Sequence, residues 1–197
     1  MDKDKTSFID TNQYKSIPFY LPSDSTTKQW SKASAKRQTN PFIFLFKRLR
    51  NWFLQCLAYH CPLNSLRIRF HRWRGVSIGK GVMLGMHCIL DNAHPEYIVL
   101  EDYTALAGNN YIITHSNPYL HFKGRLLSYL APVIIRKGGW VGVSATLLPG
   151  CEVGECSIVS AGSTASGKIP PNVVVCGNPA TIIKEFTPNA DIFSCYE

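Results

Sequence analysis

The sequence predicts a triangular parallel β-helix preceded by a basic amphipathic helical segment. Three observations carry this prediction: an apolar residue that recurs every six positions, a helical apolar pattern just before it, and an uneven division of charge between the two regions. Period six fits neither an α-helix nor an alternating strand, whereas three hexapeptides make one coil of roughly eighteen residues. The predicted fold class is therefore all-β with an N-terminal helical segment.

The hexapeptide repeat begins after Gly75 and continues in three registers. In each hexapeptide we expect the aliphatic residue to point inward and the small residues that follow it to permit the tight corners. Two interruptions break the repeat, one at 92–96 and a longer one at 116–132. Insertions in repeat folds commonly lie on the functional face, so these two mark the region of the site. The repeating apolar residues are Ile78, Leu84, Leu90, Leu100, Leu106, Ile112, Ile135, Val141, Leu147, Val153, Val159 and Ala165.

The N-terminal region has two parts. Residues 1–40 are polar and show neither helical nor strand periodicity, and we expect a mobile arm there. Residues 41–74 form the basic amphipathic helical segment and contain no acidic residue. Pro62 is expected to end the first helix at Cys61. Two destinations remain open for the apolar stripe, a membrane interface or the end of the β-helix. The stripe is Phe42, Leu45, Phe46, Leu49, Phe53 and Leu57, and the other side carries Lys47, Arg48, Asn51 and Gln55.

Charge and cysteine content exclude several classes of protein. Residues 1–74 hold fourteen Lys/Arg and four Asp/Glu, whereas residues 75–197 hold seven and nine. The main domain is slightly acidic, so no nucleic-acid partner is expected. Seven cysteines without a CxxC pair indicate neither a disulfide framework nor a cysteine zinc site, and we expect no metal.

The sequence also bears on localisation. The longest strictly apolar run of the basic region, Phe42–Phe46, is far shorter than the ~20 residues that cross a bilayer. The first residues do not have the apolar core of a secretory signal. We therefore expect a cytoplasmic protein, with peripheral association at the inner face of the membrane through residues 41–74 as an open alternative to packing.

Motifs over residues 74–186 resemble the C-terminal signature of the hexapeptide-repeat acyltransferases, above all sugar O-acetyltransferases of the maltose and galactoside type and of exopolysaccharide synthesis. This resemblance implies a left-handed β-helix over 75–186, a homotrimer with active sites between subunits, and acetyl-CoA as the donor. Residues 187–197 are then a C-terminal tail. The motifs are Val141-Gly142, Leu148-Pro149-Gly150, Val153-Gly154, Ser160-Ala161-Gly162-Ser163, Ile169-Pro170-Pro171 and Gly177-Asn178-Pro179-Ala180.

On the acceptor side, His115 is the candidate catalytic residue. Thr114-His115 ends a coil where the repeat breaks, a position that resembles the family's catalytic histidine. Imidazole has a pKa near working pH, which suits a base that deprotonates a sugar hydroxyl for attack on a thioester. Asp91 resembles the family's acceptor-binding aspartate, whereas the family's acceptor asparagine has no counterpart here. Lys123 and Arg125 are candidates for a phosphorylated sugar, with solvated loop charges as the alternative.

On the donor side, the resemblance assigns backbone and side-chain contacts with acetyl-CoA. It puts an oxyanion-stabilising amide or a pantetheine contact at Val143, after Gly142. Lys184 is placed like a basic residue that meets the CoA phosphates. The family's usual lysine after the serine appears here as Gly167, with Lys168 one residue later. Each position has an alternative reading as an ordinary coil residue. The remaining cofactor-binding candidates are Ala161 and Ser166.

These residues together predict acetyl transfer to a hydroxyl of a sugar or glycan in polysaccharide biosynthesis. N-acetylation of an amino sugar or an antibiotic is the alternative, because an amine acceptor also requires deprotonation. A zinc protein of the γ-carbonic-anhydrase type shares the β-helix and needs three imidazoles, which His87, His115 and His121 supply by residue type. A β-helix module without catalysis is the third class.

Overall fold

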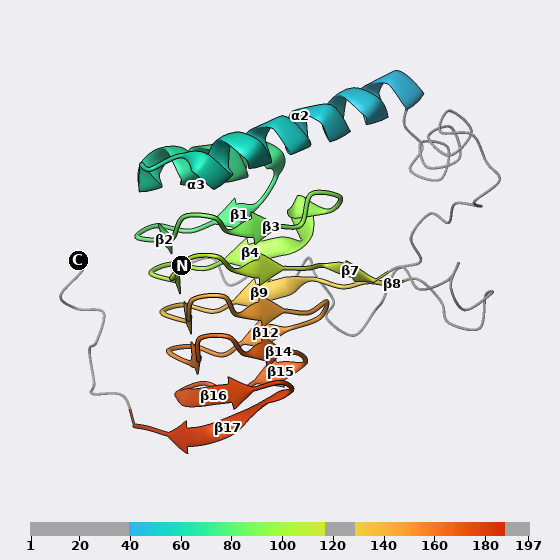
Figure 1. Cartoon of the computed structure of the whole chain (residues 1–197). Coiled ribbons are helices and arrows are strands. Elements are labelled where there is room, and N and C mark those ends of the chain that lie inside the picture. Colours follow the sequence, from blue (N-terminus) through green and yellow to red (C-terminus); the bar gives the residue numbers. More distant parts are fainter. Residues whose placement is uncertain (1–39, 117–128, 188–197) are drawn as a thin grey trace, which may run out of the picture.

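The computed structural model describes residues 40–116 and 129–187 (Figure 1). The expectations for the arm before Asn40, for the loop residues His121, Lys123 and Arg125, and for the tail after Thr187 lie outside these residues. The described chain is mostly β, with two helices at one end of a stack of short strands. In this part of the chain, no helix is long and apolar enough to cross a membrane.

The helical segment consists of two helices. The first, α2 (Pro41–His60), begins where the Asn40 side chain accepts a hydrogen bond from the Phe42 amide at 2.9 Å. It ends before Cys61, as the apolar pattern and Pro62 predict. The second, α3 (Asn64–Arg74), ends at Gly75, whose left-handed backbone (φ 109°) suits glycine.

Fifteen of the strands in the described residues form three stacked sheets, which are parallel except at the last strand. The first sheet contains β1 (Ser77–Ile78), β4 (Ile98–Leu100), β9 (Val133–Ile135), β12 (Glu152–Val153) and β15 (Lys168–Ile169). The second contains β2 (Met83–Leu84), β5 (Ala105–Leu106), β10 (Trp140–Val141), β13 (Ile158–Val159), β16 (Val173–Gly177) and the antiparallel β17 (Ala180–Glu185). The third contains β3 (Ile89–Leu90), β6 (Tyr111–Ile112), β11 (Thr146–Leu147) and β14 (Thr164–Ala165).

The chain visits the three sheets in turn, so each pass is one coil. Val141 pairs with Val159, eighteen residues later, which confirms the coil length predicted from three hexapeptides. We call the corner between the first and second sheets corner 1, that between the second and third corner 2, and that between the third and first corner 3. At corner 2 a Cβ on Gly142 would lie 2.5 Å from the Ala161 amide nitrogen, so only glycine lets these coils stack.

The core consists of the residues that the six-residue period predicts to point inward. Eleven of the twelve are buried, and Ile78 is partly buried against them. A second buried set lies four positions beyond, where small or polar residues turn each corner: Thr104, Asn110, Ala145, Cys151, Ser157 and Ser163. The repeat therefore specifies both the flat sides and the corners of the coil.

Helices α2 and α3 close the N-terminal end of the stack (Figure 1). The first coil presents main-chain carbonyls there, and helix side chains donate to seven of them. The pairs are Asn64 to Val82, Arg67 to Leu84, Arg72 to Ile78 and Gly79, Gln55 to Cys88, and Arg74 to Leu90 and Asp91. This donor requirement accounts for Arg67, Arg72 and Arg74, because a carboxylate at these positions could not donate.

Both predicted interruptions of the repeat lie at corner 3. The first contains the short 3-10 helix η2 (Pro95–Tyr97). The second begins with β7 (His115–Ser116), which pairs in antiparallel fashion with β8 (Tyr129–Leu130). His115 thus stands where β7 begins, at the second break of the repeat.

Candidate active site

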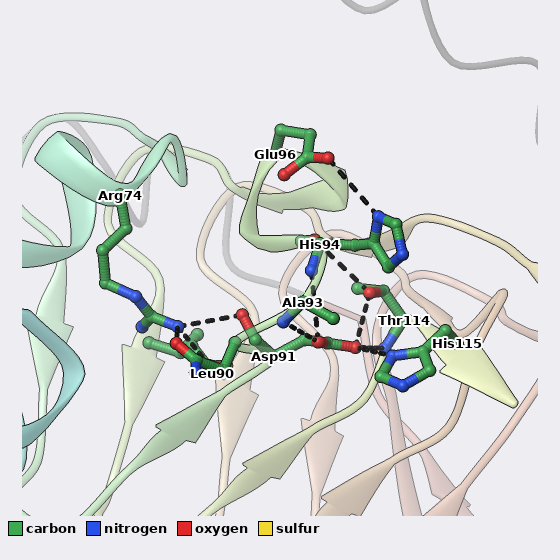
Figure 2. Close-up of polar contacts among 9 residues, drawn as sticks. Arg74, Leu90, Asp91, Ala93, His94, Glu96, Thr114 and His115 are labelled. Atoms are coloured by element: carbon green, nitrogen blue, oxygen red, sulfur yellow. Dashed lines mark hydrogen bonds and ion pairs between the residues drawn. The ribbon is translucent and has the colours of Figure 1, made fainter. Parts of the chain in front are cut away.

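Asp91, Thr114 and His115 meet at corner 3 on two successive coils (Figure 2). Asp91 follows β3 and its amide donates to the Ile112 carbonyl, which fixes the carboxylate beside the end of β6. Its Oδ2 atom lies 2.5 Å from His115 Nδ1 and accepts hydrogen bonds from the Thr114 amide at 2.9 Å and the Thr114 hydroxyl at 2.7 Å. Coil stacking therefore joins residues 24 positions apart in sequence.

The Asp91 carboxylate is buried and ionised. Its side chain is 2% exposed, while that of His115 is 33% exposed. Burial alone would raise the pKa of Asp91, but hydrogen bonds from His115 and Thr114, with the nearby imidazole, hold that pKa well below its usual range. Oδ1 adds hydrogen bonds from the amides of Ala93 at 2.8 Å and His94 at 3.3 Å.

The geometry fixes the tautomer of His115. An ionised carboxylate has no proton to donate, so the Nδ1–Oδ2 contact requires the proton on Nδ1. The Nε2 lone pair of a neutral imidazole is then available on a side chain that is one-third exposed. Such a histidine can take a proton from a bound hydroxyl or amine, and the carboxylate stabilises the imidazolium that forms.

Three residues around this pair were not predicted from the sequence. The His94 ring lies edge-on to His115 with centroids 5.6 Å apart, and His94 Nδ1 lies 3.5 Å from Glu96 Oε1. Arg74 donates to the main-chain carbonyl of Asp91 at 2.9 Å, which ties α3 to the site (Figure 2). The buried face of α3 had a detectable signal, because Arg67, His71 and Arg74 recur at helical spacing.

The structure brings some of the predicted donor-side residues near one another and separates others. Gly142, Val143 and Ala161 stack at corner 2, where the Gly162 amide donates to the Val143 carbonyl at 2.9 Å. Ser166 and Gly167 lie at corner 3, the corner of His115, and Lys168 follows them, 3.9 Å from Glu152. Lys184 is on β17. One chain therefore presents its candidate donor contacts at two different corners.

The partners of Asp91 differ from those that the resemblance implies. Its two oxygens receive hydrogen bonds from Ala93, His94, Thr114 and His115, all within the protein. Contact with an acceptor stays a prediction, and the structure gives this carboxylate the additional task of orienting His115.

The imidazoles of the zinc alternative are not brought together among the described residues. His87 lies at corner 2 against Tyr59, with ring centroids 4.9 Å apart, whereas His115 lies at corner 3. No group of three or more potential metal ligands occurs in residues 40–116 and 129–187.

Known relatives of the chain carry acetyltransferase names. The putative acetyltransferase YJL218W of Saccharomyces cerevisiae is 37% identical over 101 residues, which is 50% of each chain. The putative acetyltransferase YvoF of Bacillus subtilis is 28% identical over 147 residues, 74% of this chain and 80% of YvoF. The galactoside O-acetyltransferase of Escherichia coli is 32% identical over 97 residues, 44% of this chain and 47% of the enzyme. No protein-family model matches the chain.

Solved structures show the same fold. The hexapeptide-repeat acetyltransferase VCA0836 of Vibrio cholerae superposes with a TM-score of 0.62 at 18% identity, covering 73% of this chain and 93% of VCA0836. The chain has the fold of the hexapeptide-repeat acetyltransferases. A maltose O-acetyltransferase of Clostridium difficile gives a TM-score of 0.59 at 24% identity, covering 73% of this hexapeptide-repeat chain and 88% of that enzyme.

The sequence matches cover only part of some relatives, which limits the properties that can be inferred from them for this hexapeptide-repeat protein. The chain spans about half the length of the yeast and Escherichia coli relatives. The resemblance predicted from the motifs is confirmed. The activity and the substrate are proposals that rest on the geometry of the site.

Proposed function

We propose that this protein is an acetyl-CoA-dependent O-acetyltransferase that acts on a hydroxyl of a sugar or glycan intermediate in polysaccharide biosynthesis. The observation that carries the proposal is the buried Asp91 carboxylate bound to Nδ1 of the partly exposed His115. A galactoside and a maltose O-acetyltransferase among its relatives and structural neighbours support the choice of acceptor. The protein works in the cytoplasm under this proposal.

His115 serves as the general base in the proposed reaction. Its Nε2 atom takes the proton of the acceptor hydroxyl while the oxygen attacks the thioester carbonyl carbon of acetyl-CoA, which forms a tetrahedral intermediate. The intermediate collapses as the carbon–sulfur bond breaks, and the protonated His115 returns the proton to the CoA thiolate. The products are an O-acetyl ester and free CoA.

The main chain of the coils provides the donor side. A preset amide stabilises the developing oxyanion, and we assign this to Val143, which is half exposed after Gly142. Exposed small residues, Ala161, Ser166 and Gly167, allow pantetheine to approach the backbone closely. Lys168 and Lys184 supply cations for the CoA phosphates. A complex of VCA0836 with acetyl-CoA, at a TM-score of 0.61, supports this donor for the fold.

We propose left-handed coils, as the resemblance implies, and a homotrimer. The division of the donor contacts between corners 2 and 3 supports the homotrimer. A single chain holds Val143 and Ala161 at one corner and His115 at another. Packing corner 2 of one subunit against corner 3 of the next completes a site from both sets, and three subunits close the ring. The site is therefore formed between subunits in this proposal.

Thiol release tests the activity. Purified protein is mixed with acetyl-CoA and a panel of neutral glycans, and free CoA is measured with a chromogenic disulfide. We expect turnover that falls by roughly 10²–10⁴-fold in His115→Ala, with acetyl-CoA binding retained by calorimetry. Wild-type turnover in His115→Ala removes this residue from the mechanism, and absence of acetyl-CoA binding by folded protein rejects the donor.

The acceptor class is tested in the same assay. Amino sugars linked to UDP are compared with neutral glycans of similar size, because His115 can deprotonate either an amine or a hydroxyl. Higher kcat/KM for the neutral glycans supports O-acetylation. Higher kcat/KM for the amino sugars supports N-acetylation instead of O-acetylation.

A further inference from the structure

The outer face of α2 is apolar, the reverse of a helix that packs its apolar face on a core. The exposed residues recur at helical spacing along the whole helix, whereas its inner face holds Leu54, Gln55 and Ala58. Gln55 donates to the Cys88 carbonyl of the first coil, and Leu54 and Ala58 are buried beside it, so this side of the helix faces the protein. The outer residues, with their exposed fractions, are Phe42 (82%), Phe46 (69%), Leu49 (56%), Phe53 (56%) and Leu57 (39%).

This orientation bears on one of the two destinations that the sequence left open for the stripe, packing on the end of the β-helix. Packing of the stripe on the end of the β-helix is wrong, because the carbonyl edge of the first coil is occupied by Gln55 and by polar side chains of α3. Figure 1 shows α2 over the N-terminal end of the stack, farthest from β17. The stripe therefore points away from the coils.

Cations border the stripe. Arg48 and Arg50 are exposed, and helical spacing places them on the two flanks of the apolar stripe, whereas the exposed Lys47 lies on the side of Leu54 and Ala58. Arg67, Arg72 and Arg74 have a different task, since they donate to carbonyls of the first coil. Residues 41–74 contain no acidic side chain that would offset the exposed cations.

We propose that the outer face of α2 docks on an anionic lipid bilayer surface. A helix with phenylalanines and leucines on one side and cations along its flanks lies in the interface, with its apolar side chains among the acyl chains and its cations near lipid phosphates. Charge complementarity selects anionic lipid as the partner. The docked helix holds the coil stack away from the membrane with its capped end nearest the lipid.

Vesicle co-sedimentation of the full-length chain tests this proposal. The probes are vesicles of phosphatidylcholine with about one-third phosphatidylglycerol, and vesicles of phosphatidylcholine alone, at about 0.1 M salt. We expect binding to the anionic vesicles and at least about tenfold weaker partitioning of the double variant Phe46→Ser, Phe53→Ser. The double variant Arg48→Gln, Arg50→Gln should also bind the anionic vesicles more weakly, by roughly fivefold or less for each cation removed.

A matched control removes two exposed apolar side chains from the second sheet. Met83 and Trp140 are 59% and 50% exposed, close to the values for Phe46 and Phe53. Met83→Ser with Trp140→Ser should leave vesicle binding within about twofold of wild type. Circular dichroism of every variant verifies that the coils are folded.

Three results would overturn the proposal. Folded wild type that stays in the supernatant with anionic vesicles shows that something else covers the stripe, such as residues 1–39. Equal binding by the Phe46→Ser, Phe53→Ser variant shows that α2 is not the docking element. A smaller native mass of that variant in sedimentation equilibrium shows that a second copy of the chain occupies the face. None of these three measurements depends on acetyl transfer, so they test the docking surface separately from the proposed function.

Discussion

The N-terminal end of the coil stack is closed by side chains of two helices, whereas the C-terminal end is closed by the main chain of one strand. At the first end, five side chains donate to seven carbonyls of the first coil. At the other end, β17 pairs in antiparallel fashion with β16 and exposes most of its side chains. Both arrangements give hydrogen-bond partners to the main-chain groups of an open sheet edge. Only the closure by helix side chains depends on particular residue types.

The difference has consequences for the site. Arg74 donates to the carbonyls of Leu90 and Asp91, and the Asp91 carboxylate orients His115. The helical end is thus two contacts away from the imidazole, while the C-terminal end has no such link among the described residues. Substitutions at the two ends should therefore differ in their cost.

The largest effect is expected for Arg74→Met. Methionine fills a similar volume but leaves the buried Leu90 and Asp91 carbonyls without their donor, which should lower the free energy of unfolding by about 3 kcal/mol. Urea denaturation measures this loss. Arg74→Lys should recover part of it, and an unchanged unfolding midpoint in Arg74→Met would contradict the side-chain closure.

A smaller loss, about 2 kcal/mol at pH 7, is expected for Asp91→Asn, because the charge-assisted contacts with His115 and Thr114 are weakened. The folded-state pKa of Asp91 is depressed, so its stabilisation is full above the unfolded pKa of about 4 and is lost as the pH falls. The difference between wild type and Asp91→Asn should shrink from pH 7 to about pH 3. A constant difference in urea unfolding across this range would contradict the ionised carboxylate.

His71 should give a pH-dependent crossover. Burial, with Arg74 and Arg67 nearby, lowers the pKa of His71 to about 3, and its Nδ1 atom lies 2.9 Å from Arg74 Nη1. The folded state resists protonation, so wild-type stability should fall as the pH drops below the unfolded pKa of about 6.5, by up to about 1.4 kcal/mol per pH unit.

The variant His71→Gln lacks this titration. We expect it to be about 1 kcal/mol less stable than wild type at pH 7 and more stable near pH 5. Parallel urea titrations at the two pH values measure the crossover. If the unfolding free energies of wild type and variant decrease equally from pH 7 to pH 5, His71 is not held neutral by the fold.

The smallest effect is expected at the C-terminal end. Ile183 on β17 is 62% exposed, and main-chain pairing with β16 holds its strand, so Ile183→Ser should change the unfolding free energy by less than about 0.5 kcal/mol. Its melting temperature should differ little from that of wild type. A loss like that of Arg74→Met would mean that side-chain packing closes this end too.

The repeat and the order of the corners were predictable from the sequence because each coil forms from contiguous hexapeptides. Eleven of the twelve six-spaced residues are buried, and the helix boundary at Cys61-Pro62 follows from local backbone preference. The place of His115 at the end of a coil was predictable because the six-residue period breaks there, and its catalytic role stays a prediction. Local periodicity contains this information directly.

The roles of Asp91, Arg74 and the apolar stripe depended on the tertiary structure. Asp91 meets His115 only when coils stack, and the stacking register is a relation between residues 24 positions apart. Arg74 resembles a solvated charge in the sequence until the helix is placed over open carbonyls. An amphipathic pattern defines two faces of α2 but not which one faces the protein. The first coil presents carbonyls that need hydrogen-bond donors, so the face with Gln55 packs on it and the phenylalanines are exposed.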